Sequence, residues 1–328
     1  MQQAKPQIFV TRRLIGEGVS RLEAEAEVEL WPGDDPPPPV ALRESTIASD
    51  GILVNIADRV DEALIEASPN LRIVSQMAVG YDNIDVAAAT RRGILVTNTP
   101  GVLTDTTADM AFALLLAKAR RLPEGERAMR RSEWGEWKPW FMLGHDLTGK
   151  TLGIVGLGAI GAAVARRAAG FGMRVIYNSR RRKPDAEAAL GVEWRELPAL
   201  LAESDYVSLH MALNDETRGM IGAAELALMK PDAALINTAR GGVVDQAALV
   251  QALRDGVIGG AALDVFETEP LAANDPLMEF DNVVVAPHLG SATAETRTRM
   301  SDMAVDNLLA FFRGESPASC VNPELLKA

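Results

Sequence analysis

The glycine-rich segment Gly156-Leu-Gly-Ala-Ile-Gly161 constrains the fold of this chain more than any other segment. It follows a β-rich run, Thr151–Val155, and opens a helical run, Ala159–Phe171, after which a second β-rich run covers Arg174–Asn178. A G-x-G-x-x-G pattern alone is a weak indication, since glycines also punctuate ordinary loops. Between a strand and a helix, these glycines permit a tight turn and the close approach of a pyrophosphate to the helix N-terminus. We therefore predict a dinucleotide-binding βαβ unit, with contacts from Gly156, Gly158, Ala159, Ile160 and Gly161.

Short β-rich runs alternate with helical or amphipathic runs along most of the chain. The β-rich runs outside the glycine-rich unit are Ile8–Thr11, Val28–Trp31, Gly51–Val54, Arg72–Gln76, Ile94–Asn98, Tyr206–Leu209, Ala233–Ile236, Gly260–Val265 and Val283–Ala286. Such alternation predicts parallel sheets that are covered by helices on both faces. Because 328 residues are many for a single core, we predict an α/β protein with two doubly wound parallel-sheet domains.

The domain boundaries follow from the breaks in this alternation. The segment Asn98-Thr-Pro-Gly101 interrupts it, and Thr104–Arg121 then has the pattern of one long helix. The chain beyond Ser291 is helical through about Phe312, and no strand follows that could extend the second sheet. We therefore predict that the tail returns to the first domain. Residues 1–100 plus 292–328 would form a discontinuous substrate domain, and residues 101–291 the inserted cofactor domain.

Composition narrows the class of protein. A formal net charge of −12 argues against a nucleic-acid or anionic-membrane surface. The single cysteine, Cys320, cannot build a disulfide framework or a thiolate metal site, and we expect no metal. No stretch approaches the roughly 20 apolar residues that span a bilayer, and the first residues lack the pattern of a signal peptide. We expect a cytoplasmic protein.

Three residues of different chemistry follow predicted strands in the last third of the chain. They are Arg240 in N-T-A-R-G-G, Glu269 in D-V-F-E-T-E-P and His288 in A-P-H-L-G. Loops after strand ends face the ligand crevice of an open parallel sheet. A guanidinium there can grip a substrate carboxylate and polarise the adjacent carbonyl. The set is what the reversible reduction of a keto acid requires.

His288 is the best proton donor among the three histidines. His145 lies in a loop where a surface role is expected, and His210 ends a predicted strand, as a hydrogen-bonded histidine near the cofactor. A carboxylate partner would fix the tautomer of His288 and keep it protonated for donation. Glu267, Glu269 and the buried Asp264 are all available as this partner, and the residues alone leave the choice open.

The end of the run Arg174–Asn178 bears on which dinucleotide is used. NAD-preferring domains usually place an acid there to hold the ribose hydroxyls. This chain instead has Ser179, Arg180, Arg181 and Arg182, followed by Lys183. A serine and guanidiniums bind a 2′-phosphate that a carboxylate would repel. We predict a preference for NADP(H), with NAD(H) as an alternative cofactor.

At these residues the whole chain resembles the D-isomer-specific 2-hydroxyacid dehydrogenase family, and within it the glyoxylate/hydroxypyruvate reductase branch. The matching segments are Val79–Asp85, Val96–Gly101, Gly156–Gly161, Asn237–Asp245, Leu263–Pro270 and Pro287–Ala292. The resemblance implies a Rossmann cofactor domain inserted into a flavodoxin-like substrate domain. It also implies homodimers built through the cofactor domains, with the Trp-rich loop at 134–140 reaching the partner's active site.

The resemblance further assigns roles to individual residues. It implies that Glu269, immediately before a proline, is the family's catalytic acidic residue, that Arg240 binds the substrate carboxylate and carbonyl, and that His288 donates the proton. Val79 and Gly80 would offer backbone amides to the carboxylate, and Leu53 would line the pocket. The residues implied at the nicotinamide end of the cofactor are Thr107, Thr238, Ala239, Asp264 and Gly290.

The expected function is NADPH-dependent reduction of small 2-keto acids, glyoxylate and hydroxypyruvate, to 2-hydroxy acids by hydride transfer. A 2-ketogluconate reductase, or another D-2-hydroxyacid dehydrogenase, is the close alternative. A non-enzymatic dinucleotide-sensing scaffold or corepressor is the alternative of a different class, and the intact Arg240, Glu269 and His288 argue against it.

Overall fold

The computed structural model describes residues 4–327, and the chain divides into two compact units. Unit 1 comprises the described residues up to Leu103 together with those from Ala292 onward, and unit 2 is Thr104–Ser291. The chain therefore leaves unit 1 once and returns to it once. The returning segment begins with the long helix α12, Ala294–Phe312.

Unit 1 is a five-stranded parallel sheet in the order β2-β1-β3-β4-β5. Its strands are β1 Gln7–Val10, β2 Glu27–Leu30, β3 Gly51–Val54, β4 Ile73–Gln76 and β5 Leu95–Thr97. Its other elements are α1 Gly18–Glu25, α2 Pro39–Ala48, α3 Glu62–Glu66, α4 Val86–Arg91 and the short 3-10 turn η3 Pro323–Lys327. Strands β3, β4 and β5 are buried along their whole length, as expected for parallel strands with helices on both faces. This strand order is that of flavodoxin-like folds.

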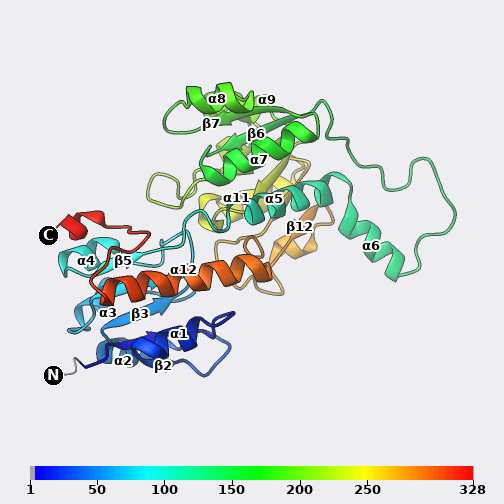
Figure 1. The fold of residues 1–328 in the computed structure, drawn as a ribbon. Coiled ribbons are helices and arrows are strands. Elements are labelled where there is room, and N and C mark those ends of the chain that lie inside the picture. Colours follow the sequence, from blue (N-terminus) through cyan, green and yellow to red (C-terminus); the bar gives the residue numbers. More distant parts are fainter. Residues whose placement is uncertain (1–3, 328) are drawn as a thin grey trace. The chain divides into compact units, whose positions relative to one another are not determined.

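Helix α12 is the element that the returning segment adds to unit 1. It packs along β3 and β4 and beside α1 (Figure 1). Met300, Ala304, Val305, Leu308 and Leu309 form its buried stripe, at the spacing of one helix face. Without this stripe, one face of the sheet in unit 1 would expose its apolar side chains to water.

Unit 2 is a seven-stranded parallel sheet in the order β12-β11-β10-β9-β6-β7-β8. Its strands are β6 Thr151–Val155, β7 Arg174–Asn178, β8 Glu193–Trp194, β9 Tyr206–Leu209, β10 Ala234–Asn237, β11 Gly260–Leu263 and β12 Val283–Val285. Its helices are α5 Thr104–Ala119, α6 Leu122–Arg130, α7 Ala159–Gly170, α8 Pro184–Leu190, α9 Leu197–Glu203, α10 Ala223–Leu226 and α11 Gln246–Arg254, with the 3-10 turns η1 Gly241–Val243 and η2 Pro276–Glu279. From β8 to β11 this is the Rossmann strand order, so the direction in which successive strands are added across the sheet reverses between β6 and β9.

Two apolar clusters cover the two faces of the sheet in unit 2. One includes α5 and α7, which lie side by side (Figure 1), and the other includes α9, α10 and α11. Carboxyl ends of parallel strands share one edge of a sheet, so the loops after β6, β9, β10, β11 and β12 open toward the same side. The predicted site residues of unit 2 are concentrated in these loops.

The predicted class, two parallel-sheet α/β domains, is confirmed, and the differences are local. The predicted helix Thr104–Arg121 ends at Ala119, because Arg121 takes a left-handed conformation with φ 51°, and a separate helix α6 follows. Pro39 opens α2, since proline is favoured at the first helical position. In the described part of the chain, residues 4–327, every helix is too short or too polar to span a bilayer.

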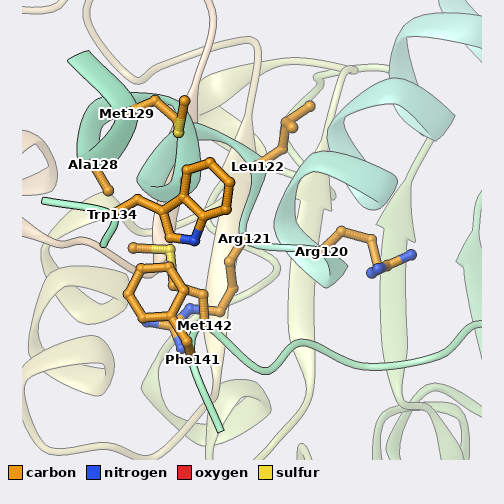
Figure 2. A pocket seen from close by; sticks show the side chains of 9 residues that line it. Arg120, Arg121, Leu122, Ala128, Met129, Trp134, Phe141 and Met142 are labelled. Carbon is orange, nitrogen blue, oxygen red and sulfur yellow. The ribbon is translucent and has the colours of Figure 1, made fainter. Parts of the chain in front are cut away.

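Residues 120–144, here called the arm, carry an unusual number of exposed apolar side chains. Among the described residues, the arm supplies seven of the 17 exposed large apolar side chains: Leu122, Met129, Trp134, Trp137, Trp140, Phe141 and Leu143. A cavity of about 340 Å³ lies within it. Figure 2 shows Trp134, Phe141 and Met142 turned toward the same hollow as Ala128 and Met129 of α6. An apolar surface of this kind marks a site of interaction.

Candidate active site

The loop after β6 shows what each glycine of the G-x-G-x-x-G segment contributes. Gly156 has φ +97°, and a Cβ there would lie 2.7 Å from the backbone of His210. A Cβ on Gly161 would lie 2.3 Å from the carbonyl oxygen of Gly156, so the helix can approach the turn only with glycine. Gly158 caps α7 without a side-chain hydrogen bond and has open space around it. The N-terminus of α7 is therefore accessible to an anion.

His288 and Glu269 form a hydrogen-bonded pair at the loops after β12 and β11. The His288 Nδ1 to Glu269 Oε2 distance is 2.7 Å. Because a carboxylate only accepts, Nδ1 carries the proton, and Nε2 is the ring nitrogen that Glu269 leaves free. The other oxygen of Glu269 accepts the amide of Phe266 at 3.0 Å. Burial alone would raise the pKa of Glu269, but the hydrogen bond and charge of His288, the amide of Phe266 and the charge of Arg240 together outweigh it, and the pKa is lowered. Glu269 is therefore a carboxylate at neutral pH.

The backbone around His288 is held by Asp264, which follows β11. His288 has φ 53°, a left-handed conformation that is costly for a residue with a Cβ. Its amide donates to the carbonyl of Asp264 at 2.9 Å. The two carboxylate oxygens of Asp264 accept the amides of Leu289 and Gly290 at 2.7 Å each. Burial raises the pKa of Asp264 despite these two amides. These three bonds fix the loop that presents the imidazole.

Arg240 lies in the loop after β10, which Asn237 shapes. The Asn237 side chain donates to the carbonyl of Arg240 at 2.8 Å and accepts the amide of Ala239 at 3.0 Å. A Cβ on Gly241 would lie 1.8 Å from the backbone of Phe266, so this loop packs directly on the segment that leads to Glu269. The charge of Arg240 contributes to lowering the pKa of Glu269. The structure thus brings the guanidinium, the carboxylate and the imidazole together at one edge of the sheet.

Comparison with known proteins identifies the family in which this arrangement occurs. The profile of the D-isomer specific 2-hydroxyacid dehydrogenase NAD binding domain matches residues 112–290. The chain is 54% identical over 324 residues to a glyoxylate reductase of Korarchaeum cryptofilum, which covers 98% of each protein. The chain belongs to the D-isomer specific 2-hydroxyacid dehydrogenase family. It is an oxidoreductase.

Solved structures of related proteins agree with this membership. A glyoxylate reductase from Paecilomyes thermophila has a TM-score of 0.88 and 32% identity, covering 98% of this chain and 99% of that one. An NADPH-dependent glyoxylate/hydroxypyruvate reductase from Sinorhizobium meliloti, in complex with NADP and malonate, has a TM-score of 0.85 and 35% identity, covering 97% of each chain. A D-2-hydroxyacid dehydrogenase uses a nicotinamide dinucleotide, so the residues of unit 2 can be tested for their fit to this cofactor.

The predicted nicotinamide end fits such a cofactor. The hydroxyls of Thr107 and Thr238 are buried, and neither has a hydrogen-bond partner within residues 4–327. A buried hydroxyl without a partner is costly, and a bound polar ligand would satisfy it. Gly290 lies against both Asp264 and Thr107, where a Cβ would be 3.1 Å from the carboxylate. Four of the residues predicted here therefore have the burial or proximity that a ligand site requires.

The segment predicted to hold the adenosine end has an internal bonding pattern. Arg182 donates twice to Glu187, at 2.8 Å each, and the Lys183 ammonium donates to the Leu157 carbonyl. Arg180 lies 3.9 Å from Glu216, and both side chains are well exposed. Ser179 donates to the carbonyl of Arg181 at 2.7 Å. Arg182 is therefore already engaged, whereas the heads of Arg180 and Arg181 face solvent.

The residues predicted to contact the substrate from unit 1 lie in β3 and in the loop after β4. Leu53 is the third of the four residues of β3 and is buried. Val79 and Gly80 lie in the loop after β4 and are partly exposed. In the described part of the chain, their amides find no acceptor, while their carbonyls accept side-chain amides of Asn98 and Gln76. Free, partly exposed amides are available to bind an anion.

Asn237, which organises the Arg240 loop, is not among the residues predicted from the sequence. Asn237 ends β10 and is 1% exposed. An asparagine side chain that follows a strand can bond the backbone two or three residues on, and this was the available signal. The segment N-T-A-R therefore contains both the guanidinium and the residue that places it.

His210 should make the stability of the fold depend on pH. Burial lowers its pKa from 6.5 to about 4, and its Nε2 lies 2.8 Å from Ser208 Oγ. The unfolded chain therefore takes up a proton that the folded chain refuses as the pH falls from 6.5 toward 4. The contribution of neutral His210 to the free energy of unfolding is therefore fully present above pH 6.5 and is lost as the pH falls from 6.5 toward 4. When the pH is lowered from about 8 to about 5, the free energy of unfolding of His210→Asn should therefore fall by about 2 kcal/mol less than that of the unaltered protein.

Urea unfolding of both proteins at the two pH values measures this difference. His145→Asn is the control, because His145 is exposed and its removal should leave the pH dependence unchanged. Parallel curves for His210→Asn and the unaltered protein would contradict the prediction.

Proposed function

We propose that this enzyme reduces small 2-keto acids, glyoxylate and hydroxypyruvate, to 2-hydroxy acids with NADPH. The observation that carries the proposal is the 2.7 Å pair of His288 and Glu269, next to the Arg240 loop. Two relatives that match this chain over almost their whole length are named glyoxylate reductases, and these names support the substrate class.

Each residue of the set has a distinct part in the proposed reaction. The Arg240 guanidinium binds the substrate carboxylate and polarises the keto group. A nicotinamide dinucleotide held by the loops of unit 2 would supply the hydride to the keto carbon. His288 gives its Nε2 proton to the keto oxygen, so that no free alkoxide forms, and Glu269 stabilises the imidazolium before the transfer. Val79 and Gly80 contribute backbone amides to the carboxylate, and Leu53 contributes apolar surface.

The cofactor residues are proposed to act along the loops of unit 2. Gly156, Gly158, Ala159, Ile160 and Gly161 admit the pyrophosphate to the N-terminus of α7. Thr107, Thr238, Ala239, Asp264 and Gly290 surround the nicotinamide end. Ser179, Arg180 and Arg181 bind the 2′-phosphate. Arg182 contributes its positive charge to the same group while it keeps its hydrogen bonds to Glu187.

Replacing His288 with asparagine tests the proton donor without disturbing the loop. Asparagine tolerates the left-handed φ of this position better than alanine, so the fold should be kept. Loss of the general acid should lower kcat by roughly 10²- to 10⁴-fold. Glu269→Gln should also lower kcat. Because a neutral amide no longer stabilises the imidazolium, the decline of kcat with rising pH should begin at a lower pH than in the wild type.

The neighbouring Glu267 provides the matched control for this test. It lies in the same segment, is exposed and is not bonded to His288. Glu267→Gln should leave kcat and its pH profile unchanged in steady-state assays with glyoxylate. Near-normal turnover by His288→Asn would rule out the proposed acid.

The basic segment after β7 tests the cofactor preference. Arg180→Ala combined with Arg181→Ala removes the two guanidiniums that face solvent, and should raise the KM for NADPH by about 10- to 100-fold. The KM for NADH should stay the same, since NADH lacks the 2′-phosphate. Arg254→Ala, at the end of α11, is the control. A wild-type enzyme that prefers NADH would overturn the choice of cofactor.

We further propose that the arm is covered by a second copy of the chain, giving a homodimer through the cofactor units. Trp137 and Trp140 are 79% and 72% exposed, which is costly for such large apolar side chains in a monomer. Changing both to glutamate should halve the molar mass measured by light scattering after size-exclusion chromatography. Val40→Glu, at an apolar residue of unit 1 that is 68% exposed, is the control and should not change the mass. A monomeric wild-type protein would refute this assembly.

A further inference from the structure

Three consecutive peptide carbonyls in the loop after β4 are all held by the surrounding chain. They belong to Ala78, Val79 and Gly80. Their donors are the Thr99 amide at 2.9 Å, the Asn98 side-chain amide at 2.8 Å and the Gln76 side-chain amide at 3.0 Å. In a surface loop, carbonyls such as these ordinarily accept hydrogen bonds from water. Here each peptide plane is fixed separately.

Fixing a carbonyl also fixes the amide on the other side of the same peptide. The peptide group is planar and trans, so its N–H points opposite to its C=O. Asn98, which holds the carbonyl of Val79, therefore directs the amide of Gly80 to the opposite side. Thr99 does the same for the amide of Val79 through the carbonyl of Ala78. Within the described residues these two amides have no acceptor of their own.

The Val79–Gly80 peptide needs such a restraint more than most. Gly80 lacks a Cβ, so steric hindrance alone does not prevent the peptide plane from turning over. A turned plane would present the carbonyl of Val79 where the amide of Gly80 now lies. An oxygen in that place would repel an anion instead of binding it.

Asn98 is itself oriented by the segment that returns to unit 1. Its Oδ1 accepts the hydroxyl of Ser319 at 2.5 Å, which leaves Nδ2 for the carbonyl of Val79. Its backbone carbonyl accepts the side-chain amide of Asn307, on α12, at 3.2 Å. Asn98, Asn307 and Ser319 are 8%, 0% and 9% exposed, so water competes little for these bonds. The orientation of the Asn98 amide is thus decided by its partners.

We propose that Asn98, oriented by Ser319, is a positioning residue that holds the Val79–Gly80 peptide with the Gly80 amide toward the substrate carboxylate. This inference rests on the proposed function, because it takes the carboxylate of a keto acid as the group that the amides receive. Asn98 does not touch the substrate. The carboxylate is bound alike before and during hydride transfer, so a loss of this restraint should weaken binding and leave the chemical step intact.

Two variants and a matched control test the proposal. Asn98→Ala removes the restraint, and Ser319→Ala leaves the asparagine in place without its orienting partner. Asn322→Ala is the control, since Asn322 is also a buried asparagine of unit 1. It holds the backbone of Val96 and Ile94 and has no bond to the Val79–Gly80 loop. All three should lower the melting temperature, so stability alone does not distinguish them.

The distinguishing measurements are the kinetics with glyoxylate and the binding of oxamate. Oxamate keeps the carboxylate and cannot accept a hydride, so calorimetry in the presence of the dinucleotide reports carboxylate binding without turnover. Asn98→Ala should raise the KM for glyoxylate and the Kd for oxamate about tenfold, with kcat within about twofold of wild type. Ser319→Ala should raise both about threefold. Asn322→Ala should change neither.

The outcomes separate this proposal from the proposed function. Unchanged KM and Kd in folded Asn98→Ala and Ser319→Ala, or equal increases in Asn322→Ala, would overturn the positioning role while glyoxylate turnover by the wild type upholds the function. Should Asn98→Ala fail to fold, the milder Ser319→Ala decides. Oxamate binding that depends on Asn98, in a protein that does not reduce keto acids, would uphold the positioning role and refute the function. Absence of both turnover and oxamate binding would refute both.

Discussion

The close packing of two loops in unit 2 determines where its chemistry can occur. The loop after β10 lies so near the segment after β11 that a single Cβ on Gly241 would overlap the backbone of Phe266. Arg240 precedes this contact and Glu269 follows it, so their positions are coupled through the backbone. The loop after β12 is joined to the same place by the carboxylate of Asp264. Three strand ends that parallel pairing already puts at one edge are thereby locked together.

The parallel sheets and their order along the chain could be predicted because they depend on short-range patterns. Runs such as Thr151–Val155 and Tyr206–Leu209 are apolar and bounded by turn residues, and they form β6 and β9 with the predicted bounds. Pattern fails where the element is too short to show one, as for the two residues of β8. It also fails at Arg121, where one left-handed residue divides an otherwise continuous helical stretch.

The candidate site was predictable to the extent that its residues follow strands. The residues alone did not decide between Glu267 and Glu269, because both follow β11. The family resemblance favoured Glu269, and the geometry of the turn shows that it is the glutamate that reaches His288. The bond between Asn98 and Ser319 joins residues 221 positions apart, which no local pattern can indicate. The engagement of Arg182 by Glu187 also depends on the position of α8. Sequence thus identified groups with the right chemistry, and the structure adds the bonds that orient them.

Asparagine recurs as the residue that gives the site loops their shape. Asn237 and Asn98 each use the amide nitrogen to hold a carbonyl and the amide oxygen to accept a second donor. Aspartate could not replace them, because a carboxylate has no donor for a carbonyl. Because these side chains are neutral, the local electrostatic field is set by the Arg240 guanidinium and by the free amides of Val79 and Gly80. That matters in a chain with a net charge of −12, which offers an anionic substrate no general attraction. Since charges farther than about 8 Å are largely screened at physiological salt, selection for a keto acid has to rest on short hydrogen bonds, and these work only if each peptide faces the right way.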